Sequence, residues 1–168
     1  MHIHFIATGG TIDKVYFDAK SEYQIGSPQV KKVLDDLQPS FTYAVEQLMA
    51  KDSLDLTDDD RTVILHRVVA LDCSHIVITH GTDTMVQTAL RLLAITDKTI
   101  VITGAMQPAR FQNTDAVFNI GMAIGACSAL APGVYIAMNG AIFDPRRVQK
   151  NRAKQCFEEI SMDSPIDG

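Results

Sequence analysis

The chain has 168 residues, of which 46% are hydrophobic and 21% are charged, so it is long enough for one domain with a real core. Its 15 basic and 20 acidic residues give a formal net charge of −5, which argues against nucleic acid as a partner because nucleic-acid-binding domains usually carry a basic excess. No apolar run has the length of a membrane span, so we expect no membrane partner. The first residues have no charged region followed by a long apolar run, so we expect no signal peptide. The three cysteines lie far apart without a Cys-x-x-Cys spacing, which fits a cytoplasmic protein whose cysteines are reduced.

Residues 2–8 are rich in Ile, Phe and His and alternate weakly, which predicts a first strand. The turn that follows, Thr-Gly-Gly-Thr at residues 8–11, contains two glycines that let the backbone bend sharply and approach a ligand closely. It would present the Thr11 hydroxyl at the carboxyl end of the strand, although an ordinary strand-ending turn could have the same sequence. His2 and His4 share one face of this strand, and because no third ligand follows at a useful spacing we interpret them as structural residues and not as a metal site.

Residues 13–26 are polar with interspersed aromatic residues and fit neither period well, which indicates a hairpin or a mobile lid loop that carries Tyr23. A helix is predicted over 28–37, because Pro28 suits the first turn and the apolar residues fall on one face. A second strand follows over 41–49.

The second strand ends in a polar turn that contains Ser53, after which Thr57 can cap a helix that runs to about Leu71. The acidic run at 58–60 complements the helix dipole, and its adjacent carboxylates point in different directions, so we do not interpret it as a metal site. The residues expected to face inward from this helix are Val63, Ile64, Val68 and Leu71.

The most informative stretch is residues 76–84, Ile-Val-Ile-Thr-His-Gly-Thr-Asp-Thr. It predicts an apolar strand over 75–79 that breaks at Gly81 and runs directly into a helix over 85–95. Two hydroxyls and a carboxylate, from Thr82, Asp83 and Thr84, stand where the strand becomes the helix. In open α/β sheets ligands bind at this edge, and the N–H groups at the start of a helix attract negative charge.

The remaining elements repeat this strand–turn–helix layout. We predict a strand over 98–103 with a strand-end turn over 104–108, a long helix over 113–130 and a strand over 134–138. Asn139-Gly140 is a strong hairpin signal before a returning strand over 141–143. A basic segment over 144–154 contains Lys150, and the chain after residue 160 has the composition of a tail.

Strands that alternate with helices predict an α/β fold, a single domain with a mainly parallel β-sheet and helices on both faces. We place the domain at residues 1–157 and a flexible tail at 158–168. Because the carboxyl ends of parallel strands meet at one edge, the polar groups at the strand ends should gather there. These groups are Thr11, Ser53, Thr82 and Asp83, joined by Tyr23 from the loop and Lys150 from the basic segment.

This set contains two candidate hydroxyl nucleophiles, a carboxylate and an amine. A threonine hydroxyl is a poor nucleophile until a base activates it, and a lysine can serve as that base where burial or neighbouring charge lowers its pKa. Thr82, Lys150 and Asp83 could form such a relay, although the sequence alone does not show that Lys150 reaches the site.

Three segments carry a family resemblance. Thr-Gly-Gly-Thr-Ile at 8–12 and Thr-His-Gly-Thr-Asp-Thr-Met at 79–85 resemble the two signature motifs of the bacterial-type L-asparaginase family, and Thr-Gly-Ala-Met-Gln-Pro at 103–108 resembles a third family segment. The resemblance covers residues 1–157 and implies the fold of that family's amino-terminal domain, whose sheet has a left-handed crossover, an exception to the usual rule. It also implies a short form that lacks the family's second domain.

The resemblance implies a role for each site residue. Thr11 would be the nucleophile that forms an acyl-enzyme, and Tyr23 would activate it from the mobile loop. Thr82, Lys150 and Asp83 would form the relay. Ser53 would bind the substrate α-carboxylate, Asp83 the α-amino group, and Gly10 would lie against the substrate. N–H groups near Thr82 would stabilise the oxyanion.

The implied reaction converts L-asparagine to L-aspartate and ammonia without cofactor or metal, in a homo-oligomer, a dimer or a tetramer, that associates through its exposed helix faces. The alternative is a glutaminase or another ω-amidase with the same chemistry, since the one methylene between asparagine and glutamine changes binding by only about 1–3 kcal/mol. A non-catalytic asparagine-binding module is a second alternative. A nucleotide-binding module is disfavoured because neither G-x-x-x-x-G-K-[ST] nor G-x-G-x-x-G occurs. We interpret His80, beside Thr82, as a residue that orients the turn and not as a catalytic base.

Overall fold

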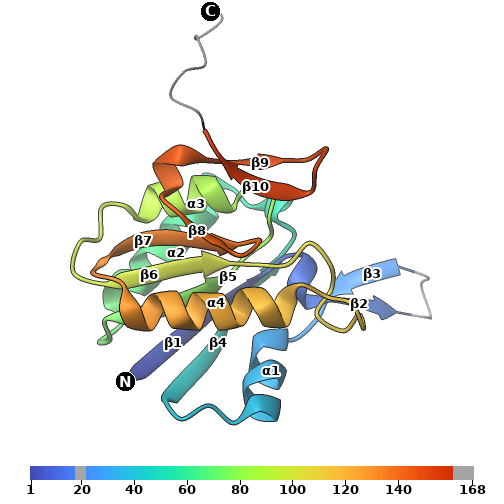
Figure 1. The fold of residues 1–168 in the computed structure, drawn as a ribbon, viewed down its shortest axis with the longest axis horizontal. Helices are drawn as coiled ribbons and strands as arrows, with labels where there is room; N and C mark the ends of the chain where they lie inside the picture. Colours follow the sequence, from blue (N-terminus) through green and yellow to red (C-terminus); the bar gives the residue numbers. More distant parts are fainter. Residues whose placement is uncertain (18–21, 161–168) are drawn as a thin grey trace, which may run out of the picture.

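A computed structural model describes residues 1–17 and 22–160. Its central element is a six-stranded sheet in the order β4-β1-β5-β6-β7-β8, in which only β8 is antiparallel to its neighbour (Figure 1). The strands of this sheet are β1 (His2–Gly9), β4 (Thr42–Lys51), β5 (His75–Thr79), β6 (Thr99–Thr103), β7 (Gly133–Met138) and β8 (Ala141–Phe143). The predicted single α/β domain with a mainly parallel sheet is confirmed.

Two antiparallel hairpins lie outside this sheet. The first, β2 (Lys14–Phe17) with β3 (Glu22–Ile25), begins just after the short 3₁₀ helix η1 (Thr11–Asp13). The second pairs β9 (Val148–Asn151) with β10 (Cys156–Glu159), after the 3₁₀ helix η4 (Pro145–Arg147). The domain boundary expected at residue 157 therefore falls inside β10, and residues 161–168, where we expected the tail, lie outside the described residues.

Helices cover both faces of the sheet, as predicted. Helices α1 (Gln29–Leu37) and α4 (Ala116–Ala129) pack against one face, on Ile3, Phe5 and Val77 among others. Helices α2 (Asp58–Ala70) and α3 (Met85–Leu92) pack against the other, on Ile6, Ile76 and Ile78. Because side chains of a strand alternate between faces, the even and odd residues of each strand fill these two separate cores.

The placement of the helices sets the handedness of the connections. Helices α3 and α4 both carry the chain in the same direction across the sheet, from β5 to β6 and from β6 to β7, but they lie on opposite faces. The two connections therefore have opposite hands. The connections through α1 and α2 have the same handedness as the α3 connection. Among these four connections, the one from β6 through α4 to β7 therefore differs in handedness from the other three. Figure 1 shows α4 in front of the sheet. Since right-handed connections are the rule, the α4 connection is left-handed, in agreement with the family resemblance.

Several details differ from the prediction. Val63 was expected to face inward but is 49% exposed, because the inward stripe of α2 follows Ile64 and Val68. Helix α3 ends at Leu92, three residues early, and α4 starts at Ala116, three residues late. No helix in the part of the chain described here is both long and apolar enough to cross a membrane.

Candidate functional site

The carboxyl ends of β1, β4 and β5 meet in close backbone contact. A Cβ atom on Gly10, which has φ +87°, would lie 2.4 Å from Cα and N of Gly81, and a Cβ on Gly81 would lie 2.5 Å from Cβ of Ser53. Only residues without a side chain allow three chain segments to approach this closely. Thr11 follows the first of these glycines and Thr82 the second, so the contact brings the two candidate nucleophiles to one place.

This contact leads to a prediction about stability. Gly10→Ala should lower the free energy of unfolding by about 2–4 kcal/mol, because the methyl group would overlap the Gly81 backbone and alanine disfavours positive φ. Chemical denaturation with urea measures the change. The matched control is Gly121→Ala on α4, where a Cβ meets nothing within 4 Å and the helix should gain about 0.5–1 kcal/mol. Equal stability of Gly10→Ala and the wild type would contradict the close packing.

Lys150 joins the site from the opposite end of the chain. Its Nζ donates to Oγ1 of Thr82 at 2.7 Å and to Oδ1 of Asp83 at 2.9 Å. The lysine side chain is 17% exposed and that of Asp83 27%, so the ion pair is partly shielded from water. The predicted meeting of Thr82, Asp83 and Lys150 is therefore present in the structure.

The β9–β10 hairpin holds Lys150 in this position. Its inner residues Val148 and Phe157 are buried in the core beside α3, and the Phe157 N–H donates to Oδ1 of Asn139 in the β7–β8 turn at 2.8 Å. Lys150 is paired with Phe157 across the hairpin. Figure 1 shows the hairpin above α3. The amine of Lys150 thereby reaches Thr82 and Asp83, just before that helix begins.

Ser53 connects the end of β4 to the β5–α3 turn. The residue is 1% exposed, its Oγ accepts the Asp83 N–H at 3.3 Å, and its carbonyl accepts the Thr84 hydroxyl at 2.7 Å. Since Oγ acts as acceptor toward Asp83, its own proton remains available for donation to a ligand. Ser53 thus lies where the sequence placed it, beside Asp83.

Tyr23 lies on β3 of the first hairpin and is 51% exposed. Its ring contacts those of Tyr16, with centroids 5.5 Å apart, and Phe111, at 6.3 Å. Within residues 1–17 and 22–160 its hydroxyl forms no hydrogen bond, to Thr11 or to any other residue. The hairpin that carries Tyr23 begins directly after η1, which contains Thr11, so the two residues are linked through the base of the hairpin.

His80 is a structural residue, as the sequence predicted. It is fully buried, its Nδ1 lies 2.8 Å from the Gly81 carbonyl, and its Nε2 lies 2.8 Å from the Thr88 hydroxyl. Because a carbonyl only accepts, Nδ1 carries the proton and Nε2 accepts from Thr88. Burial lowers the pKa of His80 from 6.5 to about 4, so the ring is neutral at pH 7 and fixes the turn before Thr82.

Asp13 is a buried carboxyl two residues after Thr11. Its backbone N–H donates to the Gly10 carbonyl at 3.1 Å, its carbonyl accepts the Gly26 N–H at 2.8 Å, and its Oδ1 accepts the Gln29 N–H at 2.8 Å. These bonds tie the Thr11 turn, the first hairpin and the start of α1 together. Burial raises the pKa of Asp13 from 3.8 to about 7, although the bond from Gln29 opposes this.

His80 and Asp13 have opposite effects on the way the free energy of unfolding changes with pH. The lowered pKa of His80 gives stability that is present above pH 6.5 and is lost as the pH falls toward about 4. The raised pKa of Asp13 gives stability that is present below pH 3.8 and is lost as the pH rises through about 7. Each contribution is about 3–4 kcal/mol at full extent, so in the wild type they largely cancel.

Single replacements should separate the two contributions. Between pH 6.5 and about 4, the free energy of unfolding of Asp13→Asn should fall with acidification, whereas that of His80→Gln should rise. Urea denaturation across this range measures both slopes, and the slope is informative even where a variant is less stable overall. Identical slopes in both variants and the wild type would contradict the assigned pKa values.

Arg152 and Asp115 were not among the predicted site residues. Arg152 Nη2 lies 3.3 Å from Oδ1 of Asp83, and this residue follows β9 directly, in the turn of the second hairpin, which the sequence did not indicate. Asp115 accepts the N–H groups of Met106 and Gln107 at 2.9 and 3.1 Å and thereby shapes the turn after β6. Nothing in the sequence distinguishes this carboxylate from an ordinary helix cap.

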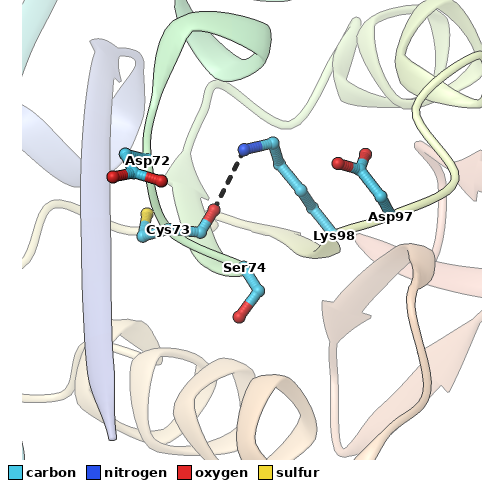
Figure 2. A pocket seen from close by; sticks show the side chains of 5 residues that line it. All are labelled: Asp72, Cys73, Ser74, Asp97 and Lys98. Carbon is cyan, nitrogen blue, oxygen red and sulfur yellow. Dashed lines mark hydrogen bonds between the residues drawn. The ribbon is translucent and has the colours of Figure 1, made fainter.

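A different cavity lies at the opposite, amino edge of the sheet, lined by Asp72, Cys73, Ser74, Asp97 and Lys98 (Figure 2). Lys98 Nζ donates to the carbonyl of Cys73 at 3.1 Å and to that of Leu71, which closes the end of α2. Burial raises the pKa of the Cys73 thiol, so it is a poor nucleophile. We assign this cluster a structural role. Throughout the described residues, no three His, Cys, Asp or Glu side chains lie close enough to hold a metal ion.

Comparison with known proteins gives the same assignment as the motifs. The family profile described as "Asparaginase, N-terminal" matches residues 2–164. L-asparaginase 2 of Escherichia coli strain K12 is 34% identical over 161 residues, which is 89% of this chain and 46% of that protein. Glutaminase-asparaginase of Pseudomonas fluorescens biotype A is 32% identical over 163 residues, 89% of this chain and 45% of that protein. The chain thus spans a little under half of the length of these relatives.

A solved structure supports the same family assignment. The thermostable L-asparaginase from Thermococcus kodakarensis superimposes with a TM-score of 0.83 at 26% identity, over 98% of this chain and 52% of that one. The similarity therefore extends over nearly all of this chain and includes the strand ends that carry the cluster described above.

Proposed function

The chain belongs to the asparaginase family, and from this premise we propose that it hydrolyses L-asparagine to L-aspartate and ammonia through an acyl-enzyme on Thr11. The observation that carries the proposal is the amine of Lys150 between Thr82 Oγ1 and Asp83 Oδ1, at 2.7 and 2.9 Å. These groups stand beside the Gly10–Gly81 contact that brings Thr11 and Thr82 together.

In the first half-reaction the Thr11 hydroxyl attacks the side-chain amide carbon. The Oγ–C bond forms, the C–N bond breaks, and the hydroxyl proton passes through Tyr23 to the nitrogen, which leaves as ammonia. For this step the hairpin has to bring the Tyr23 hydroxyl to Thr11, and the half-exposed ring leaves room for that movement. N–H groups at the start of α3 and the Thr82 hydroxyl would stabilise the oxyanion.

In the second half-reaction water attacks the ester on Thr11. Its proton passes by way of Thr82 to the nitrogen of Lys150, which has first released one proton to solvent. The same proton then returns by way of Thr82 to the departing Thr11 oxygen, which restores the hydroxyl and leaves Lys150 ready for the next cycle. Ser53 would donate its free proton to the α-carboxylate of the substrate, and Gly10, which has no side chain, would let the substrate approach the backbone. The proposed steps use no cofactor and no metal.

L-glutamine is the second candidate substrate, favoured by the similarity to glutaminase-asparaginase. The test is ammonia release by the purified chain from L-asparagine and, separately, from L-glutamine. Release from asparagine supports the proposal, and the glutamine rate gives the preference between the two. A folded protein that releases ammonia from neither would contradict it, and calorimetric binding of asparagine would then identify a binding module.

We also propose a homo-oligomer, a dimer or tetramer, that associates through exposed helix faces. Helix α4 presents Val117 and Phe118, 44% and 61% exposed, on its outer side. Sedimentation velocity of the active protein should give an oligomer, whereas a stable monomer with full activity would contradict this expectation.

A further inference from the structure

The hairpin that carries Tyr23 lies outside the six-stranded sheet, so its direction depends on the contacts at its base. The base is closed by the Gly26 N–H, which donates to the carbonyl of Asp13 at 2.8 Å. Tyr23 lies opposite Tyr16, two residue pairs beyond the first pair of the hairpin. Because a strand rises by about 3.4 Å per residue, a rotation of about 10° at the base would move Tyr23 by about 1 Å.

The side chain of Asp13 connects this base to helix α1. Its Oδ1 accepts the N–H of Gln29, the first residue of α1, at 2.8 Å, and Asp13 is only 1% exposed. Among the described residues, the N-cap residue Pro28 gives α1 no side-chain cap. Asp13 therefore caps this helix from outside, 16 residues back along the chain.

The loop after β6 supports the same base from a third side. The Ala109 N–H donates to the carbonyl of Ile12 at 3.1 Å, and Arg110 Nε donates to Oε1 of Gln29 at 3.2 Å. The ring of Phe111, in the same loop, contacts the hairpin. Hydrogen bonds thus connect the turn of the candidate nucleophile, the hairpin, the start of α1 and this loop.

We propose that Asp13 is a positioning residue, whose carboxylate holds the hairpin and the start of α1 in one arrangement and thereby sets the place of Tyr23 relative to Thr11. This inference rests on the proposed function, in which Tyr23 passes on the proton of Thr11. A displacement of about 1 Å can cost about a hundredfold in rate, so loss of the bond should lower kcat by about tenfold to a hundredfold. Ser53 and Asp83, to which we assign substrate binding, lie on other elements, so KM should change by less than about threefold.

The first experiment measures kcat and KM for L-asparagine in the wild type, Asp13→Ala and Asp13→Asn. The side-chain amide oxygen in Asp13→Asn can accept the same Gln29 N–H, so this variant should recover most of the kcat that Asp13→Ala loses. The control is Asp35→Ala, which removes a carboxylate of α1 that binds Lys31 and Tyr43 at 2.6 and 3.0 Å and should leave kcat within about twofold of the wild type. Equal kcat in Asp13→Ala and the wild type, or an equal loss in the control, would overturn the inference.

A second pair of variants removes the donor of the bond and keeps the carboxyl group. Gln29→Pro has no backbone N–H, and proline suits the first position of a helix after Pro28, whose ψ of 112° is compatible with a following proline. Gln29→Ala keeps the N–H and loses the same side chain. We expect kcat of Gln29→Pro to be about tenfold below that of Gln29→Ala, and this comparison decides the inference if Asp13→Ala does not fold. Equal kcat in the two variants would refute it.

A spectroscopic measurement keeps this inference separate from the proposed hydrolysis. The chain has no tryptophan, so Tyr16→Trp gives the hairpin a single tryptophan in contact with Tyr23. In this background Asp13→Ala should lower the fluorescence anisotropy and Asp13→Asn should restore it, without substrate or turnover. That result supports the placement of the hairpin by Asp13 even where no amide releases ammonia and the hydrolase proposal fails. Unchanged anisotropy in Asp13→Ala would refute the inference and leave the hydrolase proposal intact.

Discussion

Replacement of Thr11 by alanine is expected to abolish ammonia release from L-asparagine, with a loss of at least about a thousandfold in kcat. Without the hydroxyl no ester can form, and the remaining groups can only bind the substrate and polarise its carbonyl. Thr11 is not part of the hydrophobic core, so its replacement should leave the unfolding transition nearly unchanged. Ammonia release and thermal unfolding, measured on one preparation, separate lost chemistry from lost folding.

Two further variants complete this test. Thr11→Ser retains a hydroxyl at the same position and should recover part of the activity. Thr96→Ala, an exposed threonine in the loop before β6 at the opposite edge of the sheet, should behave like the wild type. Activity of Thr11→Ala within tenfold of the wild type would exclude Thr11 as the nucleophile and direct attention to Thr82.

Replacement of Lys150 by methionine is expected to lower kcat by about a thousandfold, the middle of the range for loss of a general base. Methionine approximates the length of lysine but cannot donate to Thr82 or accept its proton. Asp83 keeps Arg152 as a partner, so the carboxylate stays paired and the loss of stability should be about 1 kcal/mol. Steady-state kinetics should show a fall in kcat with a smaller change in KM.

The control for Lys150→Met is Lys154→Met. Lys154 belongs to the turn of the same hairpin, is 69% exposed and pairs with Glu158 at 3.3 Å, away from Thr82. Its replacement should leave kcat within about twofold of the wild type, as is usual for an exposed ion pair. If both lysine variants lost activity equally, the hairpin as a whole and not the amine of Lys150 would be responsible.

Elements with strong periodicity and clear ends were predicted best. The strands over 75–79 and 141–143 have the predicted bounds, and Asn139-Gly140 forms the turn between β7 and β8 with φ of 53° and 82°, as its sequence indicates. Helix α4 begins later than its composition suggests because Asp115 binds the N–H groups of Met106 and Gln107, which keeps the chain before Ala116 in the loop.

The second hairpin was missed because its strands are polar. Residues 149–152, Gln-Lys-Asn-Arg, show no alternation of polar and apolar residues, and Phe157 alone reveals the buried face of β10. The position of Lys150 depends on this hairpin, so its meeting with Thr82, 68 residues away, could be predicted only from the family resemblance. Periodicity cannot indicate that two segments so far apart in the chain share a site.

The first hairpin, which carries Tyr23, was predicted only in part. The sequence allowed a hairpin or a loop for residues 13–26, and the structure shows β2 and β3 with Tyr23 on the second of these strands. The role of Tyr23 as the group that activates Thr11 stays a prediction, because its contacts are with the rings of Tyr16 and Phe111. Residues 18–21 lie outside the described residues.

The central claim is that Thr11 forms an acyl-enzyme, and partition with hydroxylamine tests it most directly. L-asparagine and the β-methyl ester of L-aspartate would give the same acyl-enzyme after loss of ammonia or methanol. Hydroxylamine and water then compete for one intermediate, so the ratio of aspartate β-hydroxamate to aspartate should be identical for both substrates, and Thr11→Ala should give neither product. Different ratios for the two substrates, or hydroxamate formation by Thr11→Ala, would contradict a shared acyl-enzyme on this residue.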